Sequence, residues 1–303
     1  MSTPLPEVFA GLVDDAAVYP PGSLPLHEAV KQHRRHRAAW YAELVGPLLV
    51  PASAAAQVTD LLDPPGLAAP GAPARDIARS GGTGPSGEFA VALVADSGLA
   101  GLRAALGVAP PGLAHVEIAV AKRGEDPQPG LAGLLDLLRE RPGLPGYAEI
   151  PLTFGLLGAL DTLADAIAEG LPVHAKFRTG GLAAELFPTP IELAAVIGAC
   201  RDRALPFKLT AGLHHAIRHT DPETGFVHHG FLNVLVATVQ AMQGAEVADV
   251  GATLAGTDPV PLIEAARRML DRERPLWIGF GSCSVAEPVG DLARLGLLPG
   301  AGA

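Results

Sequence analysis

Short apolar runs that alternate with longer helical stretches constrain the fold of this chain more than any other feature. Eight of these runs are expected to be strands, at residues 12–18, 43–50, 88–95, 115–121, 147–152, 173–178, 206–211 and 276–281. The expected helices lie at 25–38, 53–62, 97–106, 130–140, 159–169, 190–203, 231–243, 259–272 and 285–294. Helix starts are marked by expected capping boxes of Thr189 with Glu192 and of Ser284 with Glu287, and by an expected cap at Asp258. Strands that alternate with helices are typical of a parallel sheet covered by helices. Eight such units predict an α/β fold, a single closed (β/α)8 TIM barrel, with an open doubly wound sheet as the alternative.

The length of the chain suits one such barrel. The sequence has 303 residues, and barrels of about 250 residues form one domain. No linker interrupts the pattern, so we expect residues 1–303 to be a single domain. Two segments break the rhythm, a Pro/Gly-rich loop at 64–87 and a histidine-rich loop at 212–230. The second loop follows the seventh strand, on the face where barrel enzymes build their sites.

Composition restricts the partners of the chain. A net charge of -10 opposes binding to nucleic acid or to an anionic membrane, because both need a basic surface. No run reaches the ~18 apolar residues of a membrane span. The N-terminus lacks a secretory pattern, and the two cysteines, Cys200 and Cys283, show no CxxC spacing, so a cytoplasmic location is expected. Barrels commonly dimerise, and a homo-oligomer stays open.

Two of the four lysines lie on expected barrel strands, in a chain with 18 arginines. Alternation of side chains along a strand points Lys176 and Lys208 into the barrel. Because neighbouring strands lie ~4.8 Å apart, the two amines are expected to be close. A neighbouring cation and desolvation lower the pKa of a lysine and let it attack a carbonyl carbon. We therefore expect both lysines to be catalytic, with structural ion pairs as the alternative.

The same alternation points Glu117, Glu149 and His174 inward. A charge inside a barrel is costly unless it is paired, so these residues and the two lysines are expected to form one interior network. Glu149 is a candidate general acid or base, and structural pairing is the alternative. Asp14 and Asp15 end the first strand and are further candidates at the mouth of the barrel, although helix capping or a loop hydrogen bond is their expected role.

Glycine and serine turns follow the last three strands, at the same predicted face of the barrel. Free N–H groups at such turns, and at a helix N-terminus, bind anions such as phosphate or carboxylate. The candidate anion-binding residues are Arg178, Thr179, Gly180, Gly181, Gly212, Gly281, Ser282 and Ser284. In the alternative interpretation, the glycines only permit tight turns.

Half of the ten histidines fall in the 212–230 loop, at His214, His215, His219, His228 and His229. Clustered imidazoles can bind a transition metal or transfer protons. His214 and His215 are therefore further catalytic candidates. No signature fixes a metal site, so no cofactor is expected, and a metal at this loop stays open.

Residues of about 170–290 resemble deoxyribose-phosphate aldolase and its class I aldolase relatives. The resemblance rests on Lys176 with Thr179-Gly180-Gly181, on Lys208 with Ala211-Gly212, and on Gly281-Ser282-Cys283-Ser284. It implies that Lys176 forms a Schiff base, that Lys208 tunes it and that the glycine turns hold a phosphate. The sequence departs from this family at Ala119, where the relatives carry an aspartate for proton transfer.

The leading hypothesis is an aldolase-like lyase that acts on a small anionic carbonyl compound, a phosphate or a carboxylate, through a lysine Schiff base. One alternative is a metal-dependent hydrolase or isomerase that uses the histidines of the 212–230 loop. Another is a non-catalytic barrel that binds a small anion.

Overall fold

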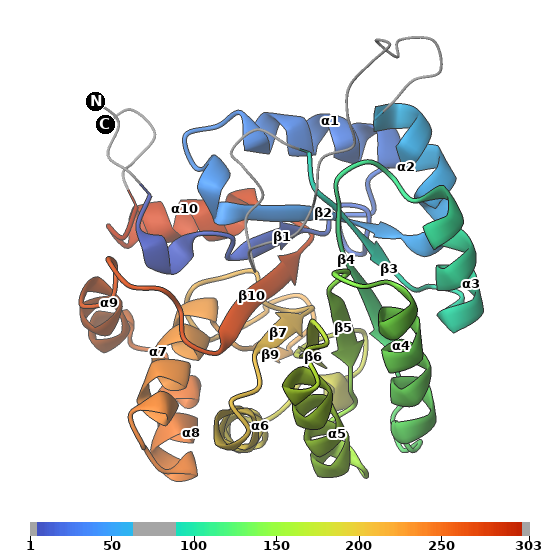
Figure 1. Ribbon diagram of the computed structural model, residues 1–303. Helices are drawn as coiled ribbons and strands as arrows, with labels where there is room; N and C mark the ends of the chain where they lie inside the picture. Colours follow the sequence, from blue (N-terminus) through green and yellow to red (C-terminus); the bar gives the residue numbers. More distant parts are fainter. Residues whose placement is uncertain (1–4, 63–88, 299–303) are drawn as a thin grey trace.

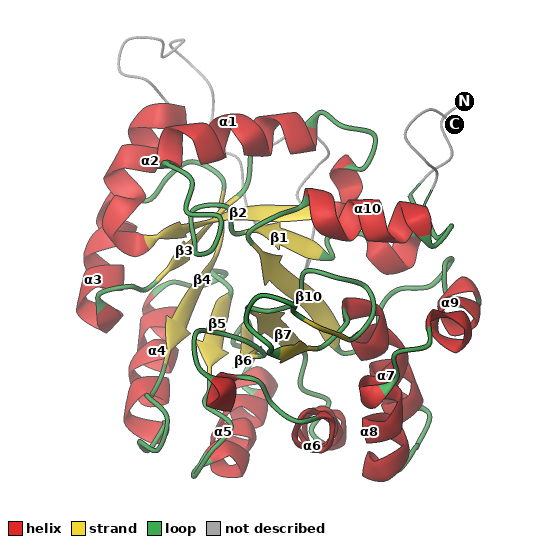
Figure 2. Ribbon diagram, turned by 180° about the vertical axis from the view of Figure 1, so that it is seen from behind, coloured by secondary structure: helices red, strands yellow, loops and turns green. Residues whose placement is uncertain are grey.

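The structure, a computed structural model, describes residues 5–62 and 89–298 of the chain. Eight parallel strands in these ranges close into a barrel, and the helices form a ring outside them (Figures 1 and 2). The prediction of a (β/α)8 TIM barrel is confirmed, and the open sheet is excluded. The Pro/Gly-rich loop expected at 64–87 lies outside the described residues.

Each of the eight predicted strands overlaps a strand of the barrel. Around the barrel the order is β1-β10-β7-β6-β5-β4-β3-β2. The strands are β1 (Val13–Asp15), β2 (Val45–Pro51), β3 (Val91–Val94), β4 (Leu113–Ala119), β5 (Gly146–Glu149), β6 (Val173–Arg178), β7 (Phe207–Thr210) and β10 (Trp277–Ser282). The histidine-rich loop contains a small antiparallel hairpin of β8 (His219–Thr220) and β9 (Val227–His228).

Ten α-helices lie in the described ranges, and nine of them were expected. They are α1 (Leu26–Arg37), α2 (Ala55–Leu62), α3 (Gly98–Ala105), α4 (Gln128–Glu140), α5 (Leu156–Ala168), α6 (Pro190–Asp202), α7 (Phe231–Met242), α8 (Val247–Ala255), α9 (Pro259–Arg267) and α10 (Ala286–Arg294). None of these helices is long and apolar enough to cross a membrane.

Two helix starts follow the sequence signals closely. Thr189 and Glu192 form a reciprocal capping box on α6: the Glu192 amide donates to Thr189 Oγ1 (3.2 Å), and the Thr189 amide donates to Glu192 Oε2 (2.7 Å). Asp258 caps α9 by accepting a hydrogen bond from the Val260 amide. At α10 only half of the expected box forms, because the Glu287 amide donates to Ser284 Oγ while the Glu287 carboxylate binds His214.

Strand register places the polar side chains of one wall of the barrel beside one another. Glu149 of β5 pairs with Lys176 of β6, which pairs with Lys208 of β7. All three point into the barrel, whereas Val173, Ala175 and Phe177 of β6 are buried in the main hydrophobic core. The alternation that the sequence predicts for β6 is therefore confirmed.

The opposite wall of the barrel interior is apolar. Ala16, Leu49 and Ala92 form a small cluster that is separate from the main core, and Tyr19 and Val94 pack against it. Ala92 is in register with His115, and Val94 with Glu117, so these side chains face the same interior as the charged ones. The interior is thus divided into an apolar wall, made by β2, β3 and Ala16 after the end of β1, and a charged wall from β4 to β7 that Asp14 of β1 also contacts.

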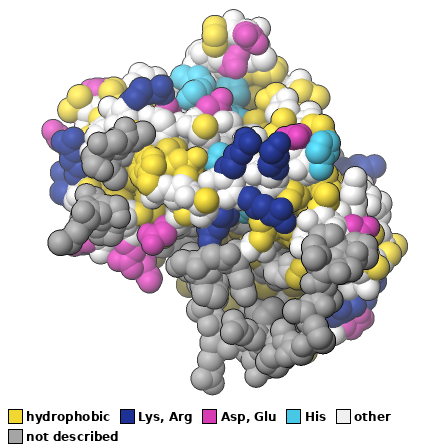
Figure 3. Space-filling model, turned by 90° about the horizontal axis from the view of Figure 1, so that it is seen from above, with side chains coloured by type: hydrophobic (Ala, Val, Ile, Leu, Met, Phe, Trp, Pro, Cys, Tyr) yellow, Lys and Arg dark blue, Asp and Glu magenta, His cyan; other side chains and the backbone are white. Residues whose placement is uncertain are grey.

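The outer helical layer carries its own charges. In the view from above, Lys and Arg side chains gather over part of the surface (Figure 3). On α1, at the top of Figure 1, Lys31, Arg34 and Arg35 are exposed. These cations lie outside the barrel and take no part in its interior network.

Candidate functional site

Lys176 lies inside the barrel between two carboxylates. Its Nζ is 2.7 Å from Glu117 Oε2 and 2.8 Å from Glu149 Oε2, and its side chain is 4% exposed. The Glu117 Oε2 atom has no aligned hydrogen-bond donor among the described residues, so its contact with Lys176 is an ion pair without hydrogen-bond geometry. The amine is thus held in place by charge from two neighbouring strands.

Lys208 lies beside Lys176 and makes the corresponding contacts on the other side. Its Nζ donates to the carboxylates of Asp14 and Glu117. It also lies 5.2 Å from the centre of the Tyr147 ring, within the range of a cation–π contact. Asp14 is therefore part of the interior network, and the expectation that it caps a helix or binds a loop is wrong.

Glu117 is the centre of this network. It is fully buried, contacts both lysines, and its Oε1 lies 3.0 Å from His115 Nε2. Burial alone would raise the pKa of Glu117, but Lys176 and Lys208 outweigh it and hold that pKa well below its ordinary value. The network contains three carboxylates (Asp14, Glu117 and Glu149) and three cations (Lys176, Lys208 and Arg178), so its formal charge is balanced.

The expectation of a lowered lysine pKa is wrong. Burial lowers the pKa of Lys176, but Glu117 and Glu149 more than compensate and raise it above its ordinary value. Asp14 and Glu117 do the same for Lys208. Each lysine meets two carboxylates as well as the other lysine, so attraction exceeds the repulsion that strand spacing alone suggested. Both amines rest as ammonium groups at neutral pH.

A cavity of about 510 Å³ opens beside this network. Glu149 and Arg178 line it, together with Lys122 and Arg123 from the loop after β4. Arg178 Nε donates to Glu149 Oε1 at 3.0 Å, and the Arg178 side chain is 44% exposed. Arg178 therefore lies between the buried charges and the solvent, as expected for a residue at the mouth of the barrel.

No family model matches this sequence, and no match was found among curated proteins or solved structures. The case for function therefore depends on the geometry of the site itself.

The expected anion-binding turns meet at the ends of neighbouring strands. Arg178 is in register with Thr210, and Thr210 with Gly281. The glycines at positions 180 and 212 are needed for close packing, because a Cβ on Gly180 would lie 2.9 Å from the Gly212 Cα. The Thr179 hydroxyl, expected to bind an anion, instead donates to the Ala211 carbonyl at 2.6 Å.

The remaining candidates of that group have different surroundings. Gly181 packs against Leu186, since a Cβ there would lie 2.4 Å from a Leu186 methyl group. Ser282 Oγ donates to the Ser284 carbonyl at 2.9 Å and accepts from the Ser284 amide at 3.3 Å. These serines hold the turn between β10 and α10 in shape.

The five loop histidines do not converge on one point. His214 contacts Glu287, His215 contacts Asp291, and His228 Nδ1 lies 3.0 Å from the Gly212 carbonyl. His229 is buried and lies 2.7 Å from the Pro188 carbonyl, while His219 meets the His215 ring edge-on and stacks on the His228 ring. The loop, which lies wholly within the described ranges, brings no three ligand atoms together as a metal site requires.

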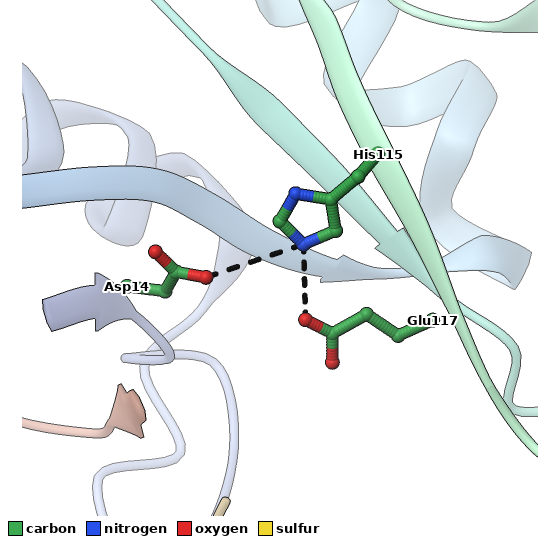
Figure 4. A group of neighbouring side chains, drawn as sticks. All are labelled: Asp14, His115 and Glu117. Carbon is green, nitrogen blue, oxygen red and sulfur yellow. Dashed lines mark hydrogen bonds and ion pairs between the residues drawn. The ribbon is translucent and has the colours of Figure 1, made fainter. Parts of the chain in front are cut away.

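One group in the described part of the chain has the ligand types and spacing of a metal site. Asp14 of β1 and His115 and Glu117 of β4 point toward one another, with their ligand atoms within 4.8 Å (Figure 4). Lys208 Nζ contacts two of these three side chains, Asp14 and Glu117. Its ammonium group supplies there the positive charge that a metal ion would bring.

This interior also holds three side chains that are not among the residues predicted from the sequence: His115, Tyr147 and Tyr19. His115 lies two residues before Glu117 on β4, so strict alternation already implied that it faces inward. Tyr147 likewise lies two residues before Glu149 on β5, so alternation implied that it also faces inward. Tyr19 follows β1 in a loop, and its buried hydroxyl has no partner among the described residues. No periodicity in the sequence could have placed it.

Proposed function

We propose that this chain is an aldolase-like lyase in which Lys176 forms an imine with a small anionic carbonyl compound. The observation that carries the proposal is the pair of carboxylates 2.7 and 2.8 Å from Lys176 Nζ, one of which also lines the cavity. An amine in contact with a proton acceptor that itself lines a cavity meets the first requirement of imine chemistry.

The first step is a proton transfer. Lys176 rests as an ammonium, so a proton must pass to Glu149 before the nitrogen can attack. Burial favours the protonated form of Glu149, but Lys176 and Arg178 outweigh it and lower its pKa. When Arg178 turns from Glu149 to an entering anion, Glu149 loses one of these cations and becomes a stronger base. Binding of an anionic substrate would thus activate Lys176.

The later steps follow from the electron demand of the imine. The free amine adds to the carbonyl carbon, and the carbonyl oxygen leaves as water, which gives a protonated imine. This imine accepts the electron pair of the C–C bond between its α and β carbons as that bond breaks, which leaves an enamine. The carbon that departs carries a hydroxyl group, which loses its proton to a carboxylate and becomes a carbonyl. Protonation of the enamine at carbon and hydrolysis of the resulting imine release the second product and the free amine. Lys208 is held by Asp14 and Glu117, and supplies a fixed positive charge beside the reacting nitrogen.

The anionic part of the substrate would bind in the cavity. Lys122, Arg123 and Arg178 lie in its wall with three carboxylates, and two of these have partners of their own: Glu149 binds Arg178, and Glu192 binds the Thr189 amide at the start of α6. Arginine is well suited to a carboxylate or a phosphate, because its planar guanidinium can donate two parallel hydrogen bonds. A small keto acid or a short sugar phosphate fits this description.

Borohydride trapping followed by intact mass and peptide mapping tests the proposal. Pyruvate, acetaldehyde and glyceraldehyde 3-phosphate are suitable probes. We expect a reduced adduct on Lys176 in the native chain, no adduct there in Lys176→Ala, and slower trapping in Lys208→Met. Lys31→Ala is the matched control, because Lys31 is exposed on α1 and should not affect trapping.

An equal adduct in Lys176→Ala, or none on any lysine of the folded native chain, would overturn the proposal. Turnover that is lost with a chelator but survives borohydride would favour metal-dependent chemistry instead.

A further inference from the structure

A second group of reactive side chains lies at the end of β10, apart from the two lysines. Cys283 follows the last residue of that strand, and His214 reaches it from the loop after β7. Both ring nitrogens of His214 lie near the sulfur, Nδ1 at 3.9 Å and Nε2 at 4.0 Å. Glu287, in the first turn of α10, completes the group.

Glu287 determines which nitrogen of His214 can act as a base. Its Oε2 lies 2.9 Å from His214 Nδ1. A carboxylate accepts a hydrogen bond, so this contact favours the tautomer in which Nδ1 carries the hydrogen. In that tautomer Nε2 is the acceptor, and this atom lies 4.0 Å from the sulfur. A nucleophile, a base and a carboxylate that orients the base are the three parts of a catalytic triad.

The surroundings of Cys283 make a base necessary. Burial raises the pKa of this thiol, and the nearby charges of Glu287 and Asp15 raise it further, although hydrogen bonding from the Gly22 backbone lowers it. The thiol is therefore protonated at neutral pH and needs a base to become nucleophilic. The absence of a side chain at Gly22 allows this backbone to approach, since a Cβ there would lie 3.2 Å from the Cys283 Cβ.

Cys200 provides a contrast within the same chain. It is fully buried in the hydrophobic core, and burial raises its pKa to about 12. Cys283 is only partly buried and directly follows the C-terminal end of β10. A side chain that only fills space needs neither partial exposure nor an oriented imidazole.

We propose that Cys283, His214 and Glu287 form a thiol-dependent acyl-transfer centre for small esters or thioesters. His214 Nε2 takes the thiol proton as the sulfur attacks the acyl carbon, and the leaving alcohol or thiol receives that proton when its bond to the acyl carbon breaks. Water, deprotonated by the same nitrogen, then adds to the acyl group and releases a carboxylic acid and the free thiol. This activity uses neither Lys176 nor Lys208, so it stands or falls independently of the imine.

Reaction of the full chain with p-nitrophenyl acetate tests the proposal. We expect a burst of p-nitrophenolate and an acetyl group that peptide mapping places on Cys283. Cys283→Ala should abolish the burst. His214→Asn should slow it by about 100-fold, the usual scale of general-base catalysis. Cys200→Ala is the matched cysteine control and should leave the burst unchanged.

A second measurement distinguishes a loss of reactivity from a loss of folding. The rate at which iodoacetamide alkylates Cys283 in folded protein, checked by circular dichroism, should fall in His214→Asn relative to the native chain. A burst that persists in Cys283→Ala, an acetyl group only on other residues, or no burst in the folded native chain would each overturn the proposal. Equal alkylation rates with and without His214 would do the same.

Discussion

Glu117 is the residue on which both lysines depend. It carries one negative charge, has no exposure to solvent, and contacts two ammonium groups and His115. A buried charge without its partners costs several kcal/mol, so each member of the group requires the others. The two lysines differ in their second carboxylate. Besides Glu117, Lys176 contacts Glu149 whereas Lys208 contacts Asp14.

Replacing Glu117 by Gln should test this dependence. The amide keeps the shape of the side chain but removes its charge, so we expect a loss of about 3–5 kcal/mol in the free energy of unfolding, measured with urea at pH 7. Glu149→Gln is the control, and it should cost less because Glu149 is 15% exposed and lies at the cavity. Equal losses in the two variants would contradict the central position of Glu117.

His174 should make stability depend on pH in the weakly acidic range. Burial, with a smaller effect of His115, lowers the pKa of His174 from 6.5 to about 4. Below pH 6.5 this histidine is therefore protonated in the unfolded chain but stays neutral in the folded chain. The free energy of unfolding falls as a result until the pH reaches about 4. The expected loss between pH 7 and pH 5 is about 2 kcal/mol from this residue.

The measurement is the urea unfolding free energy at the two pH values, compared between the native chain and His174→Asn. The variant should show a smaller difference between pH 7 and pH 5, whatever its stability at pH 7. Part of the dependence should remain, because burial also lowers the pKa of His229 to about 4. An unchanged pH difference in the variant would rule out this role of His174.

At the scale of the elements, the sequence predicted a helix best where residues close together in the sequence make the stabilising contact. The capping box of α6 needs only residues 189–192, and the sequence predicted it correctly. Helix α8 was missed because what stabilises it is tertiary. Gly251 lowers helix propensity in the middle of its nine residues, yet it lets α8 approach Ile191 of α6, where a Cβ would lie 2.6 Å from the Ile191 Cδ1.

Removing the cap of α6 should have a measurable but small effect. Thr189→Ala loses the hydrogen bond to the Glu192 amide and should lower the free energy of unfolding by about 1 kcal/mol. Ser284→Ala, at the half-formed box of α10, should cost less, because the reciprocal hydrogen bond is missing there: the Ser284 amide donates to Ser282 Oγ and not to the Glu287 carboxylate. Thermal or urea unfolding of both variants gives the comparison, and a larger loss for Ser284→Ala would contradict it.

At the scale of the whole molecule, the sequence predicted which side chains point inward but not the contacts that they make there. Alternation placed Glu117, Glu149, Lys176 and Lys208 inside the barrel because it is a local property of each strand. The pKa of each lysine depends on how many carboxylates reach it across the barrel. Asp14 does so from β1, on the far side of β10 from Lys208, and only closure of the sheet shows that contact.

This closed network should also limit stability at high pH. The pKa of Lys208 is raised in the folded chain, so its contribution to stability is complete below about pH 10.4 and is lost as the pH rises through the folded value. Lys208→Met together with Asp14→Asn removes one charge of each sign and leaves Glu117 with Lys176. Above about pH 10.4, stability of this double variant should fall less steeply, by about 1.4 kcal/mol per pH unit, than that of the native chain.

Urea midpoints measured between pH 9.5 and 11 for the native chain and the double variant test this prediction. Lys31→Met, which removes an exposed lysine, should keep the native slope, and equal slopes in all three proteins would show that Lys208 does not hold its proton more tightly after folding.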